Sequence, residues 1–392
     1  MTVAGPLEGI KVVELGVWVA GPAAGGILAD WGADVIKVEP PGGDPARMFG
    51  RMLGISPEDR HHESPPFQMD NRGKRSVVLD LATDDARAHA HALLADADVF
   101  ITNIRTGALR RIGLDFASVA AANPLLVYGL ITGYGEEGPD ADRPAYDVAA
   151  FWARSGLAHL LTRPGESPPF QRGGMGDHTA GMTLAGAVCA ALVARARTGS
   201  GQLVTTSLYR QGAYTVSFDL NTFLITGHPI AIGRRESMGN PCMNNYTAAD
   251  GRRFWLVGLQ GERHWPALCD AVQRPDWLTD ERFATGRARA GNAVELIAEL
   301  DAIFAGKTLA EWAEVFGAHP DVFWSPINSM EDVIADEQFH AAGGVVYVPD
   351  GDGASVPMVA NPADFHGTPT EVRCSAPELG AHTDEIIAKL GV

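Results

Sequence analysis

Short apolar runs alternate with helical patterns along the first half of the chain. The run "IKVVEL" at 10–15 is followed by a glycine- and alanine-rich segment containing Pro22, and then by "DVIKVE" at 34–39. This succession predicts a βαβ unit with parallel strands and a right-handed crossover. The alternation recurs, with strands predicted at 76–81, 98–103, 125–133 and 202–208, and helices at 83–97, 108–112 and 177–198. The pattern favours an α/β domain with a mainly parallel sheet.

The pattern changes after residue 227. Residues 209–227 are predicted to form a connecting helix, and Asp250-Gly251 then stands between two β-prone runs, which is a strong hairpin signal. Helical segments follow the hairpin, so 228–325 is interpreted as a smaller α+β domain. The tail, 326–392, contains further β-prone runs and a closing helix. Its periodicity does not assign it to either domain.

The chain carries a formal net charge of −17 over 392 residues. This length predicts two or three domains. A negative charge of this size repels nucleic acid and anionic lipid, so neither nucleic acid nor a membrane is expected as a partner. The start "MTVAGPLEGIK" lacks the basic and apolar regions of a signal peptide, and the apolar stretch at 181–194 is too short to span a bilayer. We expect a soluble, cytoplasmic protein.

Common metal and cofactor motifs do not occur in the sequence. The four cysteines are widely spaced, with no C-x-x-C pair, and the histidines lack convergent spacing with carboxylates. We therefore expect no metal site, and free thiols in a reducing compartment. The sequence has no G-x-G-x-x-G after its first strand, no P-loop and no G-x-S-x-G, so a dinucleotide cofactor and serine hydrolase chemistry have little support.

Basic residues gather at the ends of two predicted strands. The groups are Arg72, Lys74 and Arg75 before one strand, and Arg105, Arg110 and Arg111 after another. In so acidic a chain, such groups indicate a site for a phosphate-bearing ligand near the edge of the sheet. The alternative is a solvated surface without a ligand, and a single basic group more often has that role.

Asp177, in the stretch "GGMGDHTAGM" at 173–182, has two interpretations. An aspartate just ahead of a helix is a favoured N-cap, and local rules alone favour that role. Alternatively, the glycines before it let a substrate approach, and a carboxylate that the helix start keeps ionised can act as a nucleophile. The residues around Asp177 leave both interpretations open.

Several segments in order along the chain carry a family resemblance. They are "PLEGIKVVELGVWVAGPAAGGILADWGADVIKVEPPGGD", "NRGKRSVVLDL", "ADVFITNIRTGALRRIGL", "NPLLVYGLITGYGEEGP", "GDHTAGMTLAGAVCAALVARARTGSGQLVTTSL" and "LGAHTDEII". Together they resemble the class III CoA-transferase family, which also contains the 2-methylacyl-CoA racemases. The matches extend from residue 6 to about residue 385, so the resemblance covers nearly the whole chain.

The resemblance implies a particular architecture. A large Rossmann-like domain that binds coenzyme A would contain residues 1–208, with the tail 326–392 returning to it. Residues 209–227 would be a linker helix, and 228–325 the small α+β domain. Two chains would form an interlocked-ring homodimer, in which each chain threads a hole in the other.

The resemblance also implies roles for individual residues. Asp177 falls on the family's nucleophilic aspartate, and Tyr146 and Asp147 match positions beside the reacting thioester. The adenosine phosphates are expected near Arg72, Lys74 and Arg75 on charge grounds. Pro40 stands where many members have an arginine, so Arg47 is a candidate replacement for that phosphate contact. Coenzyme A contacts fall on Val19, Ala20, Leu79, Asn103, Ile104, Arg105 and Arg111.

The activity implied by the resemblance is transfer of coenzyme A from an acyl-CoA donor to a carboxylic acid acceptor. It would proceed through aspartyl anhydride and aspartyl-CoA thioester intermediates, with no cofactor beyond coenzyme A as substrate. The alternative is a 2-methylacyl-CoA racemase, which needs a histidine opposite the aspartate. Tyr146 replaces that histidine here, and tyrosine is a poor base near neutral pH, so transfer is favoured over racemisation.

Overall fold

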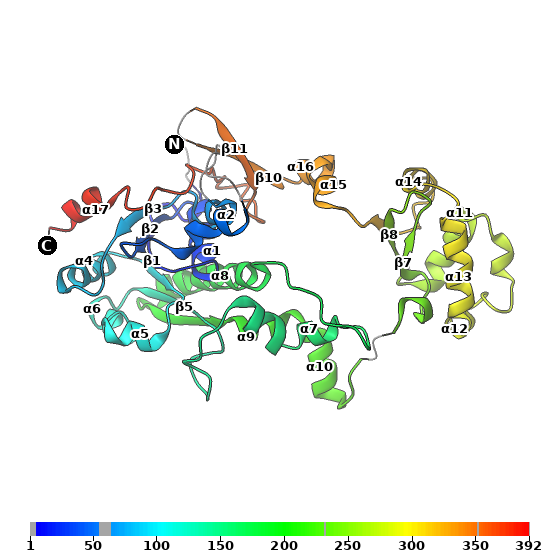
Figure 1. The fold of residues 1–392 in the computed structure, drawn as a ribbon, viewed down its shortest axis with the longest axis horizontal. Coiled ribbons are helices and arrows are strands. Elements are labelled where there is room, and N and C mark those ends of the chain that lie inside the picture. Colours follow the sequence, from blue (N-terminus) through cyan, green and yellow to red (C-terminus); the bar gives the residue numbers. More distant parts are fainter. Residues whose placement is uncertain (1–4, 55–63, 231–232, 351–352, 392) are drawn as a thin grey trace. The chain divides into compact units, whose positions relative to one another are not determined.

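The computed structural model divides into two compact units (Figure 1). The large unit comprises Met1–Pro229 and His340–Val392, and the small unit comprises Ile230–Phe339. Within them, the structure describes residues 5–54, 64–230, 233–350 and 353–391.

The small unit extends beyond residue 325, the boundary that the resemblance implies. Strand β9 (Trp324–Pro326) pairs antiparallel with β8 (Arg253–Val257), so the chain is still part of the small sheet at residue 326. An ion pair of 3.0 Å between Arg252 and Asp332 holds the following segment to the same unit. The chain joins the large unit only after Phe339.

A six-stranded parallel sheet forms the centre of the large unit (Figure 1). The strand order is β3-β2-β1-β4-β5-β6. From β1, the chain first adds β2 and β3 on one side, and then adds β4, β5 and β6 on the other side. The predicted mainly parallel sheet is confirmed, and this reversal places a crevice at the carboxyl ends of β1 and β4. The strands are β1 Lys11–Leu15, β2 Asp34–Glu39, β3 Arg75–Val78, β4 Val99–Thr102, β5 Val127–Thr132 and β6 Gln202–Ser207.

Helices cover both faces of this sheet. One face packs against α1 and α8, and the other packs against α4, α6 and α17. The helices of the large unit are α1 Ala20–Asp30, η1 Pro45–Met48, α2 Phe49–Met52, α3 Pro65–Asn71, α4 Asp84–Ala95, α5 Thr106–Arg111, α6 Phe116–Ala122, η2 Val148–Arg154, α7 Leu157–Leu160, α8 Met175–Thr198, α9 Leu208–Thr215, α10 Ser217–Thr226 and α17 Thr383–Leu390. A hairpin of β10 Val345–Pro349 and β11 Ser355–Val359 completes the unit.

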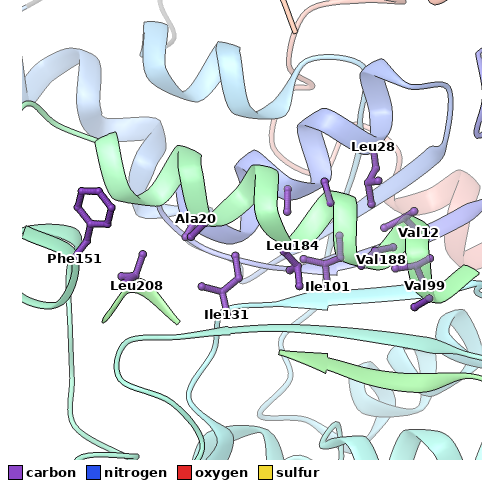
Figure 2. Packing of buried hydrophobic residues seen from close by; sticks show 14 of the residues in the cluster. Val12, Ala20, Leu28, Val99, Ile101, Ile131, Phe151, Leu184, Val188 and Leu208 are labelled. Atoms are coloured by element: carbon purple, nitrogen blue, oxygen red, sulfur yellow. The ribbon is translucent and has the colours of Figure 1, made fainter. Parts of the chain in front are cut away.

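Helix α8 packs closely on α1 and the sheet. Figure 2 shows Leu184 and Val188 of α8 lying over Val99 and Ile101 of β4, within one buried apolar cluster. The two helices approach so closely that a Cβ at Gly181 would lie 2.8 Å from the side chain of Ala23. Glycine is therefore needed at this crossing.

The composition of α8 also bears on the membrane expectation. The helix extends beyond the stretch 181–194 that was expected to be too short, and by length and composition Met175–Thr198 is long and apolar enough to cross a membrane. Core helices of globular proteins meet the same criteria. The buried face of α8 lies against α1 and the sheet, which accounts for the apolar residues on that face.

Two helices replace the single connecting helix predicted at 209–227. Helix α9 ends at Thr215 and α10 begins at Ser217, with Val216 between them. Helix α9 packs against the π-helical turn η2. Helix α10 has no buried residue, although its sequence is apolar. Its side chains of Phe218, Leu224 and Ile225 are 80%, 78% and 84% exposed.

The small unit contains a three-stranded antiparallel sheet in the order β7-β8-β9. Strands β7 (Met243–Thr247) and β8 form the hairpin predicted around Asp250-Gly251. An aromatic core packs against this sheet, with Phe304 lying 5.0 Å from both Phe254 and Trp312. The helices are η3 Arg235–Ser237, α11 Gly261–Ala271, η4 Pro275–Leu278, α12 Gly286–Gly291, α13 Ala293–Phe304, α14 Leu309–Gly317 and α15 Met330–Ala335, and α16 Glu337–Ala341 crosses the unit boundary.

Candidate active site

A pocket of about 390 Å³ opens at the carboxyl ends of β1, β4 and β5. This is the place where parallel sheets of this topology bind ligands. Most of its wall is apolar, and its polar groups come from four separate segments of the large unit. The lining residues are Val17, Trp18, Ala20, Asn103, Ile104, Arg105, Ala108, Ile131, Thr132, Gly133, Pro144, Ala145, Tyr146, Asp147, Asp177 and Leu208.

Asn103 joins the two loops that meet at the strand reversal. Its side-chain oxygen accepts a hydrogen bond of 2.9 Å from the Val17 N–H, and its amide donates one of 2.8 Å to the Val17 carbonyl. A Cβ at Gly21 would lie 3.0 Å from the same side-chain oxygen. The side chain of Asn103 is therefore a fixed bridge in the floor of the pocket.

Asp177 lies in the first turn of α8 and lines the pocket. The helix begins at Met175, and its N-cap is Gly174 in a left-handed conformation, with φ 76°. Asp177 thus lies three residues after the N-cap, and the cap interpretation is wrong. Its carboxylate makes no hydrogen bond to any other residue that the structure describes.

Asp147 supplies the carboxylate that caps α8. One oxygen accepts a hydrogen bond of 3.0 Å from the backbone N–H of Gly176, and the other accepts one of 2.7 Å from the side-chain amide of Gln171. A Cβ at Gly176 would lie 2.3 Å from Asp147 and 2.2 Å from the ring of Phe151. Glycine at 176 is therefore required for this close approach.

The environment of Asp177 raises its pKa to about 7. Burial is the main cause, and the negative charge of Asp147 adds to it, while His178 acts in the opposite direction. The expectation that the helix start keeps Asp177 ionised is therefore corrected, because burial and a neighbouring like charge disfavour the ionised form. A carboxyl group with such a pKa in a cleft is typical of a functional site.

His178 turns away from the pocket toward a second buried acid. Its ring nitrogen Nε2 lies 3.1 Å from a carboxylate oxygen of Asp70, which is 3% exposed. This contact raises the pKa of His178, and burial raises the pKa of Asp70. His178 adjoins Asp177, and the positive charge of its ring, when protonated, lowers the pKa of Asp177.

Seven of the residues implied by the resemblance line this one pocket. Arg105, at the start of α5, is exposed, and its guanidinium has no ion-pair or hydrogen-bond partner among the residues that the structure describes. Tyr146 is 63% exposed at the rim. The seven are Ala20, Asn103, Ile104, Arg105, Tyr146, Asp147 and Asp177.

The basic group before β3 lies elsewhere. Arg72 is buried and forms a two-bond ion pair with Asp30. Arg75 begins β3, at the amino ends of the strands, and forms a two-bond ion pair with Asp34. These placements do not favour the predicted contact with phosphates, because the donors are already used within the fold.

Lys74 is buried beneath α1 in a chain of ion pairs. Its ammonium lies 2.6 Å from Glu14, and the other Glu14 oxygen lies 2.9 Å from Lys37. Burial lowers the pKa of Lys74 to about 8. A buried ammonium held by a carboxylate has a structural role here and is not placed to meet a phosphate in the pocket.

Four further residues from the resemblance lie outside the pocket lining. Val19 is buried at the N-terminus of α1, and Leu79 is buried in the core on the opposite face of the sheet. Arg111 is exposed at the end of α5. Arg47 forms a two-bond ion pair with Glu39, so the structure does not favour it as the replacement for the arginine missing at Pro40.

Trp18 is a pocket residue that sequence reasoning missed. Its φ is 64°, in the left-handed region that side chains of this size rarely adopt. Its backbone N–H donates a hydrogen bond of 2.9 Å to Asp44. The surrounding sequence "GVWVAG" contains no signal for this conformation, because a residue distant in sequence imposes it.

In the part of the chain that the structure describes, no cluster of side chains supports a metal site. There, no group of three or more histidine, cysteine, aspartate or glutamate side chains is arranged to hold a metal ion. Among the described residues, the polar side chains of the pocket are two neighbouring carboxylates, one exposed guanidinium, an amide and the hydroxyl groups of Thr132 and Tyr146.

Comparisons with known proteins agree over nearly the full length of the chain. Residues 7–383 match the model of CoA-transferase family III. The (R)-2-hydroxy-4-methylpentanoate CoA-transferase of Clostridioides difficile is 33% identical over 98% of this chain and 95% of its own. The cinnamoyl-CoA:phenyllactate CoA-transferase of Clostridium sporogenes is 32% identical over 98% and 93%. The crystal structure of a CAIB/BAIF family protein from Brucella suis superimposes with a TM-score of 0.85, at 33% identity over 99% and 100%.

Proposed function

The chain belongs to CoA-transferase family III and is an enzyme of that class, and we propose that Asp177 is the nucleophile with which it transfers coenzyme A. The donor is an acyl-CoA and the acceptor a carboxylic acid. The observation on which the proposal rests is the Asp177 carboxylate, which lines the pocket without a hydrogen-bond partner among the described residues and has a pKa of about 7.

The first half of the proposed reaction loads coenzyme A onto the enzyme. The Asp177 carboxylate attacks the thioester carbonyl, forms a C–O bond and releases the CoA thiolate, which leaves an acyl-aspartyl anhydride. The thiolate then attacks the Asp177 carbonyl of this anhydride. That step forms the aspartyl-CoA thioester and releases the donor acid as its carboxylate.

The second half reverses these steps with the acceptor. The acceptor carboxylate attacks the carbonyl of the aspartyl-CoA thioester, giving a second anhydride and free thiolate. The thiolate attacks the acceptor's carbonyl, which forms the new acyl-CoA and restores the Asp177 carboxylate. Each intermediate keeps roughly the energy of a thioester, whereas an ester of serine would trap the acyl group.

The neighbours of Asp177 support this role. A carboxylate with a pKa of about 7 is a stronger base, and hence a better nucleophile, than an ordinary aspartate, while much of it is still ionised at neutral pH. Asp147 holds the first turn of α8 in place. In the proposal, Arg105 meets a negatively charged part of coenzyme A, and Tyr146 and Asp147 lie beside the thioester.

Racemisation is the less favoured alternative. It requires a second base facing Asp177 across the α-carbon, and the residue at the corresponding position is Tyr146. His178 does not serve as this base in the described structure, because its ring is bonded to Asp70 and does not line the pocket. Exchange of the substrate's α-proton in deuterated water, without an acceptor acid, would support racemisation.

The test of the proposal is a trapping experiment. The enzyme is incubated with a panel of acyl-CoA donors and carboxylic acids, treated with hydroxylamine, and digested for mass spectrometry. A hydroxamate on Asp177 is the expected result. Asp84→Asn is the matched control, since Asp84 also lies in the first turn of a helix but is 95% exposed and outside the pocket. A label elsewhere, or transfer by Asp177→Asn, would contradict the assignment.

We also propose that two chains form the interlocked homodimer of the family and that the enzyme is cytoplasmic. Helix α10 supports the dimer, because its apolar side chains are exposed in the single chain. Light scattering after size exclusion tests it. Replacing Leu224 and Ile225 by serine should shift the measured mass from that of two chains toward that of one. A mass of one chain for the original protein would refute the dimer.

A further inference from the structure

The backbone of Trp18 is strained at the mouth of the pocket. A φ of 64° is uncommon for any residue with a side chain, and it is unfavourable for one as large as tryptophan. Such strain persists only when the surrounding structure imposes it, and it occurs most often at functional sites.

Asp44 holds the backbone of Trp18. Its Oδ1 accepts hydrogen bonds of 2.9 Å from the N–H groups of Trp18 and Ala46. Its Oδ2 lies 2.8 Å from the ammonium of Lys37, which is itself fixed by Glu14 at 2.9 Å. Asp44 is 1% exposed and does not line the pocket. A buried ion-pair chain thus holds the backbone of one pocket residue.

The indole of Trp18 is built into an aromatic group. It meets the ring of Tyr146 edge to face, with centroids 6.1 Å apart and planes at 83°. On another side it contacts Phe49, with centroids 5.4 Å apart. Trp18 and Tyr146 both line the pocket that contains Asp177. We call this pair the aromatic wall.

We propose that the aromatic wall selects acyl groups that carry a flat aromatic ring, and that Asp44 is the positioning residue that holds Trp18 in the wall. This inference rests on the proposed function, since it concerns the acyl group attacked by Asp177. An aromatic ring gains binding free energy from edge-to-face and offset contacts in addition to the burial of its surface. A saturated ring of the same size gains binding free energy from burial alone. The other pocket walls, including Ile131, Pro144 and Leu208, are apolar and suit either ring.

The experiment compares two donors of matched size, benzoyl-CoA and cyclohexanecarbonyl-CoA, with one acceptor acid. The measured quantity is the ratio of their kcat/KM values. We expect the unmodified enzyme to prefer benzoyl-CoA by about fivefold or more, and Trp18→Leu to bring the ratio close to one. Tyr347→Leu is the control, because Tyr347 is an exposed aromatic residue of β10 outside this pocket. It should keep the original ratio.

Two variants of Asp44 test the positioning role. Asp44→Asn keeps an oxygen that can accept the Trp18 N–H, so the donor ratio should be retained. Asp44→Ala removes the acceptor and should lower the ratio without changing any atom that lines the pocket. A purely structural role would lower turnover of both donors equally and leave the ratio unchanged. Thermal melting of each variant identifies any that fail to fold. If Trp18→Leu fails, Tyr146→Leu replaces it, because it removes the other ring of the aromatic wall at a position that is 63% exposed.

The outcomes separate this inference from the proposed function. Turnover of acetyl-CoA or succinyl-CoA together with a ratio near one in the unmodified enzyme would overturn the aromatic wall alone. A preference for benzoyl-CoA that survives Trp18→Leu would also overturn it. If no acyl-CoA donor is turned over with any acid, the proposed function itself fails.

Discussion

Asp147 accepts a hydrogen bond of 3.0 Å from the backbone N–H of Gly176, and this bond caps the helix that carries the proposed nucleophile. The cap comes from a loop 29 residues earlier in the chain. It leaves the carboxylate of Asp177, one residue after Gly176, free to face the pocket. The same arrangement brings two carboxylates close enough for one to raise the pKa of the other.

Replacing Asp177 by asparagine should abolish transfer while increasing stability above neutral pH. We expect kcat to fall about a thousandfold or more, because the nucleophile is lost. Since the folded pKa of about 7 lies above the unfolded value, stability contributed by the protonated group is lost as the pH rises through 7. Asparagine removes this loss, so at pH 8 the variant should be more stable by about 1 to 3 kcal/mol.

Urea denaturation of the original protein and of Asp177→Asn at pH 5 and pH 8 measures this difference. The gain should be largest at pH 8 and clearly smaller at pH 5, because the stability of the protonated group is lost between the unfolded pKa near 3.8 and the folded pKa of about 7. A variant that is less stable at both pH values would show that Asp177 supports the helix after all. Asp84→Asn, which is exposed, should show no comparable gain at pH 8.

Asp147→Asn should move the acidic limb of the pH-rate profile to lower pH. The amide oxygen still accepts the Gly176 N–H, but the charge that raises the pKa of Asp177 is gone. We expect the rate at pH 6, relative to its plateau, to rise about two- to fivefold. Asp147→Ala loses the cap as well and should cost about 1 kcal/mol of stability. An unchanged limb in Asp147→Asn would exclude the electrostatic coupling.

His178→Gln should move the same limb in the opposite direction. The protonated ring lowers the pKa of Asp177, so its loss should raise that pKa and reduce the rate at pH 7 about two- to fivefold. The buried carboxyl of Asp70 also loses its charged partner, which should lower the free energy of unfolding by about 1 to 3 kcal/mol. The pH-rate profile distinguishes the two effects, since a stability loss alone does not move the limb.

Much of the large unit could be predicted from the sequence. Each parallel strand is a short apolar run, and the run at 34–39 coincides with β2. The strand order was not predictable by periodicity, because it depends on which runs pair across the sheet. The strand order also determines where the pocket lies, so the convergence of Asn103, Tyr146 and Asp177 on one pocket needed the structure or the family resemblance.

The errors at the site share one physical origin. Local rules assign a cap to the nearest carboxylate, whereas α8 is capped by a residue distant in sequence. Charge counting found Arg72, Lys74 and Arg75, but not the acids that neutralise them, since Asp30, Glu14 and Asp34 lie far away along the chain. Partners brought together by the fold cannot be read from a window of ten residues.

Two glycines of α8, Gly176 and Gly186, share a helix but differ in their surroundings. A Cβ at Gly176 would lie 2.2 Å from Phe151 and 2.3 Å from Asp147, whereas one at Gly186 would meet nothing within 4 Å. Gly176→Ala should therefore displace the first turn of α8 and cost about 3 kcal/mol or more. Gly186→Ala should instead stabilise the protein by about 0.5 to 1 kcal/mol, through helix propensity.

Transfer activity should follow the same division. Gly176→Ala moves the Asp177 carboxylate relative to the thioester, and a displacement of about 1 Å can cost about a hundredfold in rate. Gly186→Ala leaves the first turn unchanged and should keep the original kcat. Thermal melting and kcat, measured on both variants, test the argument together. If Gly176→Ala kept full activity and stability, the close approach of Asp147 to the helix start would not be what positions the nucleophile.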